Sequence, residues 1–186
     1  MKVTAGVDEV GRGSLIGPVY AAAVILNKSI NMKILKDSKT LSKEKRRELN
    51  FYIKKNSIWA IGQASVKEIE KINILQASLL AMKRAIIKLK KKPYVVLIDG
   101  NKLPSLKNYN LENVIKGDQK IPSISAASII AKVSRDRFIT RLSKKFKRYG
   151  WDTNFGYGTK EHLGAIKKYG ITKYHRKTFS PISRYK

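Results

Sequence analysis

The sequence predicts an α/β fold, in which short buried strands alternate with amphipathic helices. Mainly apolar runs at Val3–Val7, Val19–Leu26 and Tyr94–Ile98 have the length and residue types of buried strands. The segment Val66–Lys91 instead repeats its apolar residues at intervals of three and four, which is the helical period. Because the two kinds of segment alternate along the chain, we expect helices layered on a sheet.

The first part of the chain holds three of the expected strands. The second strand follows directly after Gly17-Pro18, and we expect it to pair with the first. A helix is expected at Ser42–Lys55, and a third strand at Ser57–Ala64 comes immediately after it.

The long helical segment that follows has one expected break and a clear end. We expect an interruption near Asn73, and Pro93 ends the segment because proline cannot continue a helix. The apolar residues of its helical period are Ile69, Ile72, Leu75, Leu79, Met82, Ile86 and Leu89.

The second half of the chain contains two further helices. A short strand is expected near Asn113–Lys116, before a long helix at Ser123–Phe146 that opens after Pro122. A basic run, Lys144–Arg148, closes this helix, where the helix dipole favours cations. A last helix at Lys160–Tyr169 precedes an irregular, basic tail.

The composition indicates a globular protein of one domain with a small appended part. The chain has 186 residues, of which 42% are hydrophobic, enough for a proper core. It has no cysteine, which excludes disulfides and thiolate zinc sites. The longest apolar run, Val19–Leu26, is too short to span a membrane, and the expected first strand leaves no room for a signal peptide. We therefore expect a cytoplasmic protein without a membrane partner.

Charge is the strongest compositional signal. Forty Lys and Arg residues against thirteen Asp and Glu give a net charge of +27. Such a surplus attracts polyanions and favours a nucleic-acid partner. The alternative is that many lysines reflect only the bias of a genome rich in Lys, Ile and Asn.

Four of the few acidic residues lie at the ends of expected elements, beside glycines. Asp8 and Glu9 follow the first strand, Asp99 follows the strand ending at Ile98, and Asp118 follows Gly117. Together they would repel one another unless cations lie between them. Two divalent ions, Mg²⁺ or Mn²⁺, would satisfy four carboxylates and activate a water for attack on a phosphodiester. The alternative for Asp8 and Glu9 is an exposed acidic turn.

The element Gly11-Arg12-Gly13 directly after the acidic pair supports a phosphate ligand. Glycines let the backbone approach a ligand closely, and the arginine between them can pair with an anion. The sequence therefore predicts metal-assisted chemistry on a phosphate.

An ordered set of motifs over residues 4 to about 181 resembles the ribonuclease HII family. The motifs are Asp8-Glu9-Val10-Gly11-Arg12-Gly13, Leu35-Lys36-Asp37-Ser38-Lys39, Ile98-Asp99-Gly100, Gly117-Asp118-Gln119-Lys120, Ser125-Ala126-Ala127-Ser128-Ile129, Ala131-Lys132-Val133-Ser134-Arg135-Asp136 and Gly156-Tyr157-Gly158-Thr159. The resemblance implies a ribonuclease H-like fold, a mixed five-stranded central sheet flanked by helices with a small C-terminal helical part. It further implies a catalytic domain over residues 1–148 and a C-terminal segment over 149–186 that completes the substrate cleft.

The same resemblance implies the reaction and its metal ligands. We expect hydrolysis of the RNA strand of RNA–DNA hybrids, and cleavage 5′ of single ribonucleotides in duplex DNA, leaving 3′-hydroxyl and 5′-phosphate ends. Asp8, Glu9, Asp99 and Asp118 would hold the two ions, with Asp8 bridging both.

Several residues are implied as substrate contacts by this resemblance. Gly11, Arg12 and Gly13 would meet the 2′-hydroxyl and the phosphates, and Tyr157 would contact the 2′-hydroxyl and stack on the next sugar. Ser38, Lys39 and Arg176 would contact phosphates, with Asp37 ordering the loop that presents Lys39. Asn73 and Gln76 would reach a nucleic-acid strand, the alternatives being helix capping for Asn73 and a surface amide for Gln76.

Other residues in or near the motifs have structural interpretations. We expect Asp136 to form an ion pair, with metal ligation as the alternative, and Phe179 to pack the tail onto the body. We expect His162 to lie on a helix surface, and no spacing of the two histidines suggests a catalytic triad or a zinc protease site.

Two other functions remain open at the level of the sequence. One is a DNA resolvase or integrase-like nuclease on the same fold, and the other is a non-enzymatic basic RNA-binding protein. The chain lacks the glutamine-led clamp-binding motif seen in the tails of many bacterial relatives, so clamp tethering is not expected. A monomer is expected.

Overall fold

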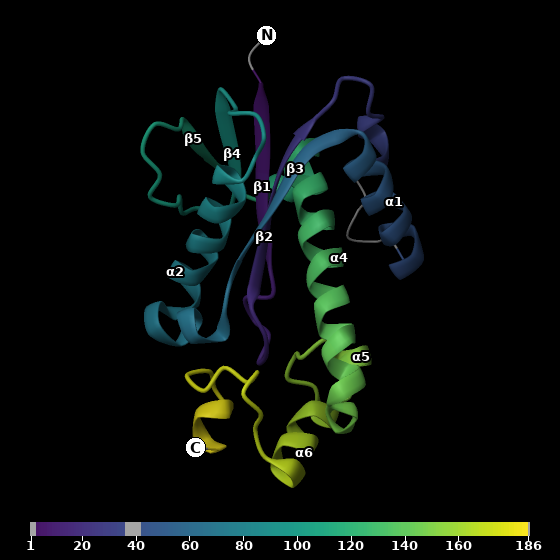
Figure 1. Cartoon of the computed structure of the whole chain (residues 1–186), viewed down its shortest axis with the longest axis vertical. Helices are drawn as coiled ribbons and strands as arrows, with labels where there is room; N and C mark the ends of the chain where they lie inside the picture. The colour runs from purple at the N-terminus through teal and green to yellow at the C-terminus, as the bar shows by residue number, and fades with distance from the viewer. Residues whose placement is uncertain (1–2, 36–41, 186) are drawn as a thin grey trace.

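A computed structural model describes residues 3–35 and 42–185, apart from the side chain of Lys33. These residues form a three-layer α/β structure around one five-stranded sheet (Figure 1). The strand order is β3-β2-β1-β4-β5, with β1 at the centre. The strand bounds are β1 Thr4–Val10, β2 Val19–Leu26, β3 Ser57–Ala64, β4 Val95–Asp99 and β5 Leu111–Val114.

The sheet is mixed, as the resemblance implies. β1 pairs antiparallel with β2, which pairs antiparallel with β3. On its other side β1 pairs parallel with β4, which pairs parallel with β5. The carboxyl ends of β1, β4 and β5 therefore lie at the same edge of the sheet.

Helices cover both faces of the sheet. Ala5 and Val7 of β1 face α2, whereas Ala22 and Val24 of β2 face α1 and α4 on the other side. The helix bounds are α1 Lys43–Lys55, α2 Val66–Ile87, α3 Gly117–Lys120, α4 Pro122–Lys145, α5 Trp151–Asn154 and α6 Lys160–Tyr169, with short 3₁₀ turns η1 Met32–Leu35, η2 Lys147–Tyr149 and η3 Ile182–Tyr185.

Local sequence signals explain where the principal helices begin. The Ser42 side chain accepts a hydrogen bond from the Lys45 backbone N–H at the start of α1. A capping box of Ser65 and Glu68 opens α2. Pro122 begins α4, where its missing N–H costs nothing.

Close contact between β1 and α4 depends on a glycine. A Cβ added to Gly6 would lie 2.2 Å from the backbone carbon of Ser123. Only glycine permits this approach, which fixes the start of α4 against the central strand.

Most predicted elements are confirmed, and three boundaries need correction. β2, β3 and α6 have the predicted bounds, and α2 is interrupted at Asn73 as expected. The first strand continues to Val10, so the acidic pair lies inside it. α2 ends at Ile87 instead of Lys91, and β5 is Leu111–Val114 instead of Asn113–Lys116.

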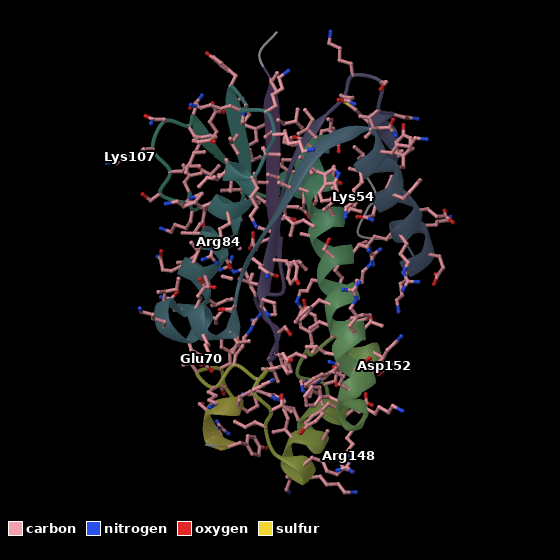
Figure 2. The ribbon with its side chains drawn as sticks, viewed as in Figure 1. Lys54, Glu70, Arg84, Lys107, Arg148 and Asp152 are labelled. Carbon is pink, nitrogen blue, oxygen red and sulfur yellow. The ribbon has the colours of Figure 1, made fainter. Side chains whose placement is uncertain are left out.

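The C-terminal segment packs onto the end of the sheet and onto α4. Trp151 and Ile182 are fully buried in a core cluster that also contains Ile16 and Leu142. Phe179 contacts this cluster and the α2 side of the core, which confirms its expected packing role. Figure 2 shows Glu70 at the end of α2 nearest this segment, and Glu70 accepts a hydrogen bond from the Lys177 N–H at 2.9 Å.

Within the described ranges, no helix combines the length and the apolar composition needed to cross a bilayer.

Candidate active site

Asp8 and Asp99 lie side by side because of the parallel register of β1 and β4. Val7 pairs with Ile98, and each acid is the next residue of its strand. Ile98 belongs to the core cluster on the α2 side, so strand alternation directs Asp99 to the opposite face, toward α4. The Ser128 side chain of α4 hydrogen-bonds Asp8 on that same face.

A backbone hydrogen bond connects Asp99 to the residue before Asp118. The Gly117 N–H donates to Asp99 Oδ1 at 2.7 Å, which places the first turn of α3 beside the end of β4. Asp118 is the next residue and its side chain is buried. The start of α3, which contains Asp118, therefore lies beside the end of β4.

Glu9 is connected to the same region through its charge. Arg12 Nη1 donates to Glu9 Oε1 at 3.2 Å. Burial raises the pKa of Glu9, the nearby Arg12 opposes this, and the negative charge of Asp99 adds to the rise. Its carboxylate is thus within electrostatic reach of Asp99.

The electrostatics of this region suit a cation. Burial raises the pKa of Asp8 well above its usual value, and the charges of Glu9 and Asp99 raise it further. Hard oxygen donors crowded in this way are the ligands that Mg²⁺ and Mn²⁺ prefer. In residues 3–35 and 42–185, no three His, Cys, Asp or Glu side chains already form a closed metal-binding cluster. The four predicted ligands therefore do not form a closed set in the described structure.

The loop after β1 has a conformation that requires glycine. Gly11 has a φ of +91°, and a Cβ there would lie 2.2 Å from Arg135 Nε. Arg12 and Gly13 are exposed. The loop therefore packs against Arg135 at Gly11, whereas Arg12 and Gly13 are accessible to a ligand.

Tyr157 lies next to this loop. Its Cε1 is 4.0 Å from the position of a Cβ on Gly13, and its ring is 37% exposed. The Arg135 guanidinium lies 5.6 Å from the ring centroid. The structure thus brings together Gly13 and Tyr157, which are distant in the sequence, on the open side of the loop.

The structure corrects the expected role of Arg176. Its side chain is fully buried, so it does not present its guanidinium to a phosphate at the surface. It instead donates from Nη1 to the Arg12 carbonyl at 2.8 Å and from Nε to the Gly17 carbonyl at 3.0 Å. Burial and the charge of Arg135 lower the pKa of Arg176 to about 9. Arg176 supports the loop from beneath.

Sequence reasoning missed Arg135 as a component of the site. Its guanidinium is fully buried and donates to the carbonyls of Phe155 and Ile16. It thereby links the segment before Tyr157 to the segment after the loop. The sequence signal was its position in a family-like motif, but the motif alone does not show that the side chain turns inward.

His162 is also buried, not on a helix surface as expected. The Trp151 indole N–H donates to His162 Nε2 at 2.9 Å, so the imidazole carries its proton on Nδ1. That Nδ1–H donates to the Tyr157 carbonyl at 2.9 Å. His175 Nε2 lies 3.3 Å from His162 Nε2. Burial is the main cause that lowers both histidine pKa values, with that of His175 at about 4.

Asn73 acts as a cap inside α2. It has a φ of 63°, and its Oδ1 accepts from the Gln76 N–H at 3.1 Å. The structure therefore bears out the capping alternative for Asn73. Both side chains are exposed, and their contact with a nucleic-acid strand stays a prediction.

Four predicted residues remain, and the structure describes one of them. Asp136 lies 3.0 Å from Lys132 Nζ, which confirms the expected ion pair. Asp37, Ser38 and Lys39 lie outside the described residues.

The sheet topology and the acids at its edge place the chain among metal-dependent nucleases of the ribonuclease H-like fold. A family model described as Ribonuclease HII matches residues 5–182. Ribonuclease HII of Pelagibacter ubique (strain HTCC1062) is 84% identical over 183 residues, covering 98% of both chains. The enzyme of Nitrosospira multiformis is 53% identical over 178 residues, covering 95% of this chain and 89% of the relative. The chain belongs to the ribonuclease HII family.

Solved structures agree with this assignment. Ribonuclease H2 from Pyrococcus horikoshii OT3 matches with a TM-score of 0.81 at 27% identity, covering 98% of this chain and 96% of that one. Bst-RNase HIII in complex with Mn²⁺ has a TM-score of 0.77 at 19% identity, covering 99% and 69%, and shows the shared fold. The protein is thus a metal-dependent endoribonuclease that cleaves RNA in RNA–DNA hybrids and at embedded ribonucleotides. The resolvase and RNA-binding alternatives are set aside.

Proposed function

We propose that Asp8, Glu9, Asp99 and Asp118 bind two divalent ions, Mn²⁺ or Mg²⁺, with Asp8 bridging them. The observation that carries this proposal is the register of β1 and β4, which sets Asp8 beside Asp99. Glu9 and Asp99 would each hold one ion, and Asp118 would complete the site for the nucleophile. Repulsion among Asp8, Glu9 and Asp99 is the energetic reason for ion binding.

When bound, the ions activate a water and neutralise the charge that develops on the phosphate. The residues of the chain position the phosphodiester for this attack. Arg12, which pairs with Glu9 at 3.2 Å, lies at the border between the carboxylates and the glycine loop. Cleavage occurs 5′ of the ribonucleotide and leaves 3′-hydroxyl and 5′-phosphate ends.

The loop and Tyr157 recognise the ribonucleotide. Gly11, Arg12 and Gly13 meet the 2′-hydroxyl and adjacent phosphates through a backbone held by Arg176. The Tyr157 hydroxyl contacts the 2′-hydroxyl, and its ring stacks on the next sugar, which distinguishes a ribose from a deoxyribose. The adjacency of Tyr157 and Gly13 supports a shared role in reading one sugar.

The setting of the reaction follows from the substrate. We propose that the protein acts as a monomer in the cytoplasm, where bacterial DNA resides, on hybrids and on duplex DNA with single ribonucleotides.

Incubation with a labelled duplex containing one ribonucleotide, with Mg²⁺ or Mn²⁺, tests the proposal. The length of the product gives the cut position, and an all-DNA duplex is the control. We expect one cut 5′ of the ribonucleotide, no cut in the control, and loss of activity in EDTA. Cleavage of the all-DNA duplex, or full activity in EDTA, would refute it.

A further inference from the structure

A strongly basic groove lies between α1 and α4, outside the carboxylate site. Its volume is about 440 Å³. Six cationic side chains line it, three from each helix: Lys43, Arg46, Arg47, Arg137, Arg141 and Lys144. Figure 1 shows the two helices side by side on one face of the sheet.

The groove has little negative charge of its own. Among the described residues, Asp136 is the one acid that lines it, and that carboxylate already lies 3.0 Å from Lys132. Burial and the charge of Arg137 also lower the pKa of Lys54 near the end of α1. So many like charges held together favour a polyanion as ligand.

Apolar packing joins the two helices that carry these cations. Leu49 and Ile53 of α1 belong to the same core cluster as Ile130 and Val133 of α4. Because the helices are joined through this core, their basic faces are held beside each other.

The spacing of the α4 cations fits a phosphate backbone. Arg137, Arg141 and Lys144 recur after four and three residues, so they share one helix face. Seven residues of helix rise about 10 Å. That distance corresponds to about three nucleotides of one strand, at about 3.4 Å each.

The groove adjoins the proposed ribose-reading residues. Lys43 lies 5.3 Å from the centre of the Phe155 ring, and Lys132 lies 5.1 Å from it. Phe155 is two residues before Tyr157 and is held by Arg135. A duplex seated at Tyr157 therefore passes close to the end of the groove.

We propose that this groove binds the phosphate backbone of the duplex that flanks the ribonucleotide on one side. This inference rests on the proposed function, because it assigns the groove to the same substrate. The groove contributes affinity without touching the reacting phosphate.

The test compares two double variants of equal charge change. Arg137→Ala/Arg141→Ala removes two groove cations, and Lys88→Ala/Lys90→Ala removes two exposed cations at the end of α2. Steady-state kinetics and fluorescence anisotropy are measured over a range of salt. The substrates are single-ribonucleotide duplexes that are long on both sides, or shortened on one side or the other. Circular dichroism verifies that both variants are folded.

For the groove variant on the long duplex, we expect KM to rise about tenfold, with kcat unchanged and a salt slope smaller by about two. This increase in KM should disappear when the flank that binds in the groove is shortened, and it should persist when the other flank is shortened. The inference fails if the groove variant matches the Lys88/Lys90 control, or if shortening either flank has the same effect. If the wild type does not cut at the ribonucleotide, the proposed function fails instead, and anisotropy still decides whether the groove binds duplex.

Discussion

The buried pair His162 and His175 makes stability depend on pH in a direction that the structure defines. The His175 pKa is about 4 in the folded protein, against about 6.5 in an unfolded chain. Between these values the unfolded state binds the proton and the folded state does not. The contribution of His175 is therefore present above pH 6.5 and is lost as the pH falls toward 4.

The size of this effect follows from the two pKa values. Between pH 7.5 and pH 4.5, protonation of the unfolded chain at this single site lowers the free energy of unfolding by about 2.5 kcal/mol. The assay is urea denaturation at both pH values, for the wild type and for His175→Asn. Asparagine retains an acceptor for the Thr172 N–H that His175 Nδ1 now accepts at 2.8 Å.

Comparing His175→Asn with the wild type separates the effect of His175 protonation from that of the carboxyl groups, which titrate in both proteins. We expect His175→Asn to be less stable at pH 7.5 and to lose about 2.5 kcal/mol less than the wild type on acidification. His162 adds to the acid sensitivity of both proteins, because burial also lowers its pKa. Equal losses in the two proteins would show that His175 is not held neutral by burial.

Three further predictions concern the site directly. Asp99→Asn should lower kcat at least a thousandfold while hybrid binding, measured by anisotropy, changes less than threefold; a similar loss of binding would contradict the ligand role. Gly11→Ala should destabilise the protein by about 2–4 kcal/mol in urea, because its Cβ would clash with Arg135 at a positive φ, whereas Gly164→Ala, with open space around it, serves as the control. Arg176→Lys keeps the charge but cannot hold both carbonyls, so kcat/KM should fall about tenfold; unchanged kinetics would mean that the loop does not need this support.

The strands that the sequence predicted correctly are those with unambiguous apolar content. β2 is buried along almost its full length, and β3 follows the end of α1 after a single residue. The edge strand β5, Leu-Glu-Asn-Val, has only two apolar residues and was placed two residues too late. Its position depends on pairing with β4, and this pairing cannot be read from the local sequence.

The carboxylates could be singled out because they lie close to the ends of apolar runs or beside a glycine, although the structure places Asp8 and Glu9 inside β1 and Asp99 at the end of β4. The convergence of Asp8 with Asp99 needed only the correct pairing of two parallel strands. Tyr157 was found through the resemblance alone, and its adjacency to Gly13 depends on tertiary packing.

The burial of Arg176 and His162 could not be predicted. The partners of Arg176 are remote in the sequence, and no motif identifies the partners of His162. Arg176 bonds carbonyls 164 and 159 positions away. His162 is buried against Trp151 and His175, in a helix whose spacing of polar residues equally permits an exposed histidine. A charged or polar residue type predicts exposure on average, and only the complete fold shows the exceptions.

These exceptions have a common location that explains why the protein retains them. Arg176 holds the Arg12 carbonyl, Arg135 holds the Phe155 carbonyl, and His162 holds the Tyr157 carbonyl. All three buried side chains thus fix backbone on the two segments proposed to read the ribose. Burying two arginines near each other is unfavourable, since each loses hydration and repels the other. A fold selected for stability alone would replace them with apolar residues, so their presence here is best explained by the need for a fixed loop geometry at the substrate.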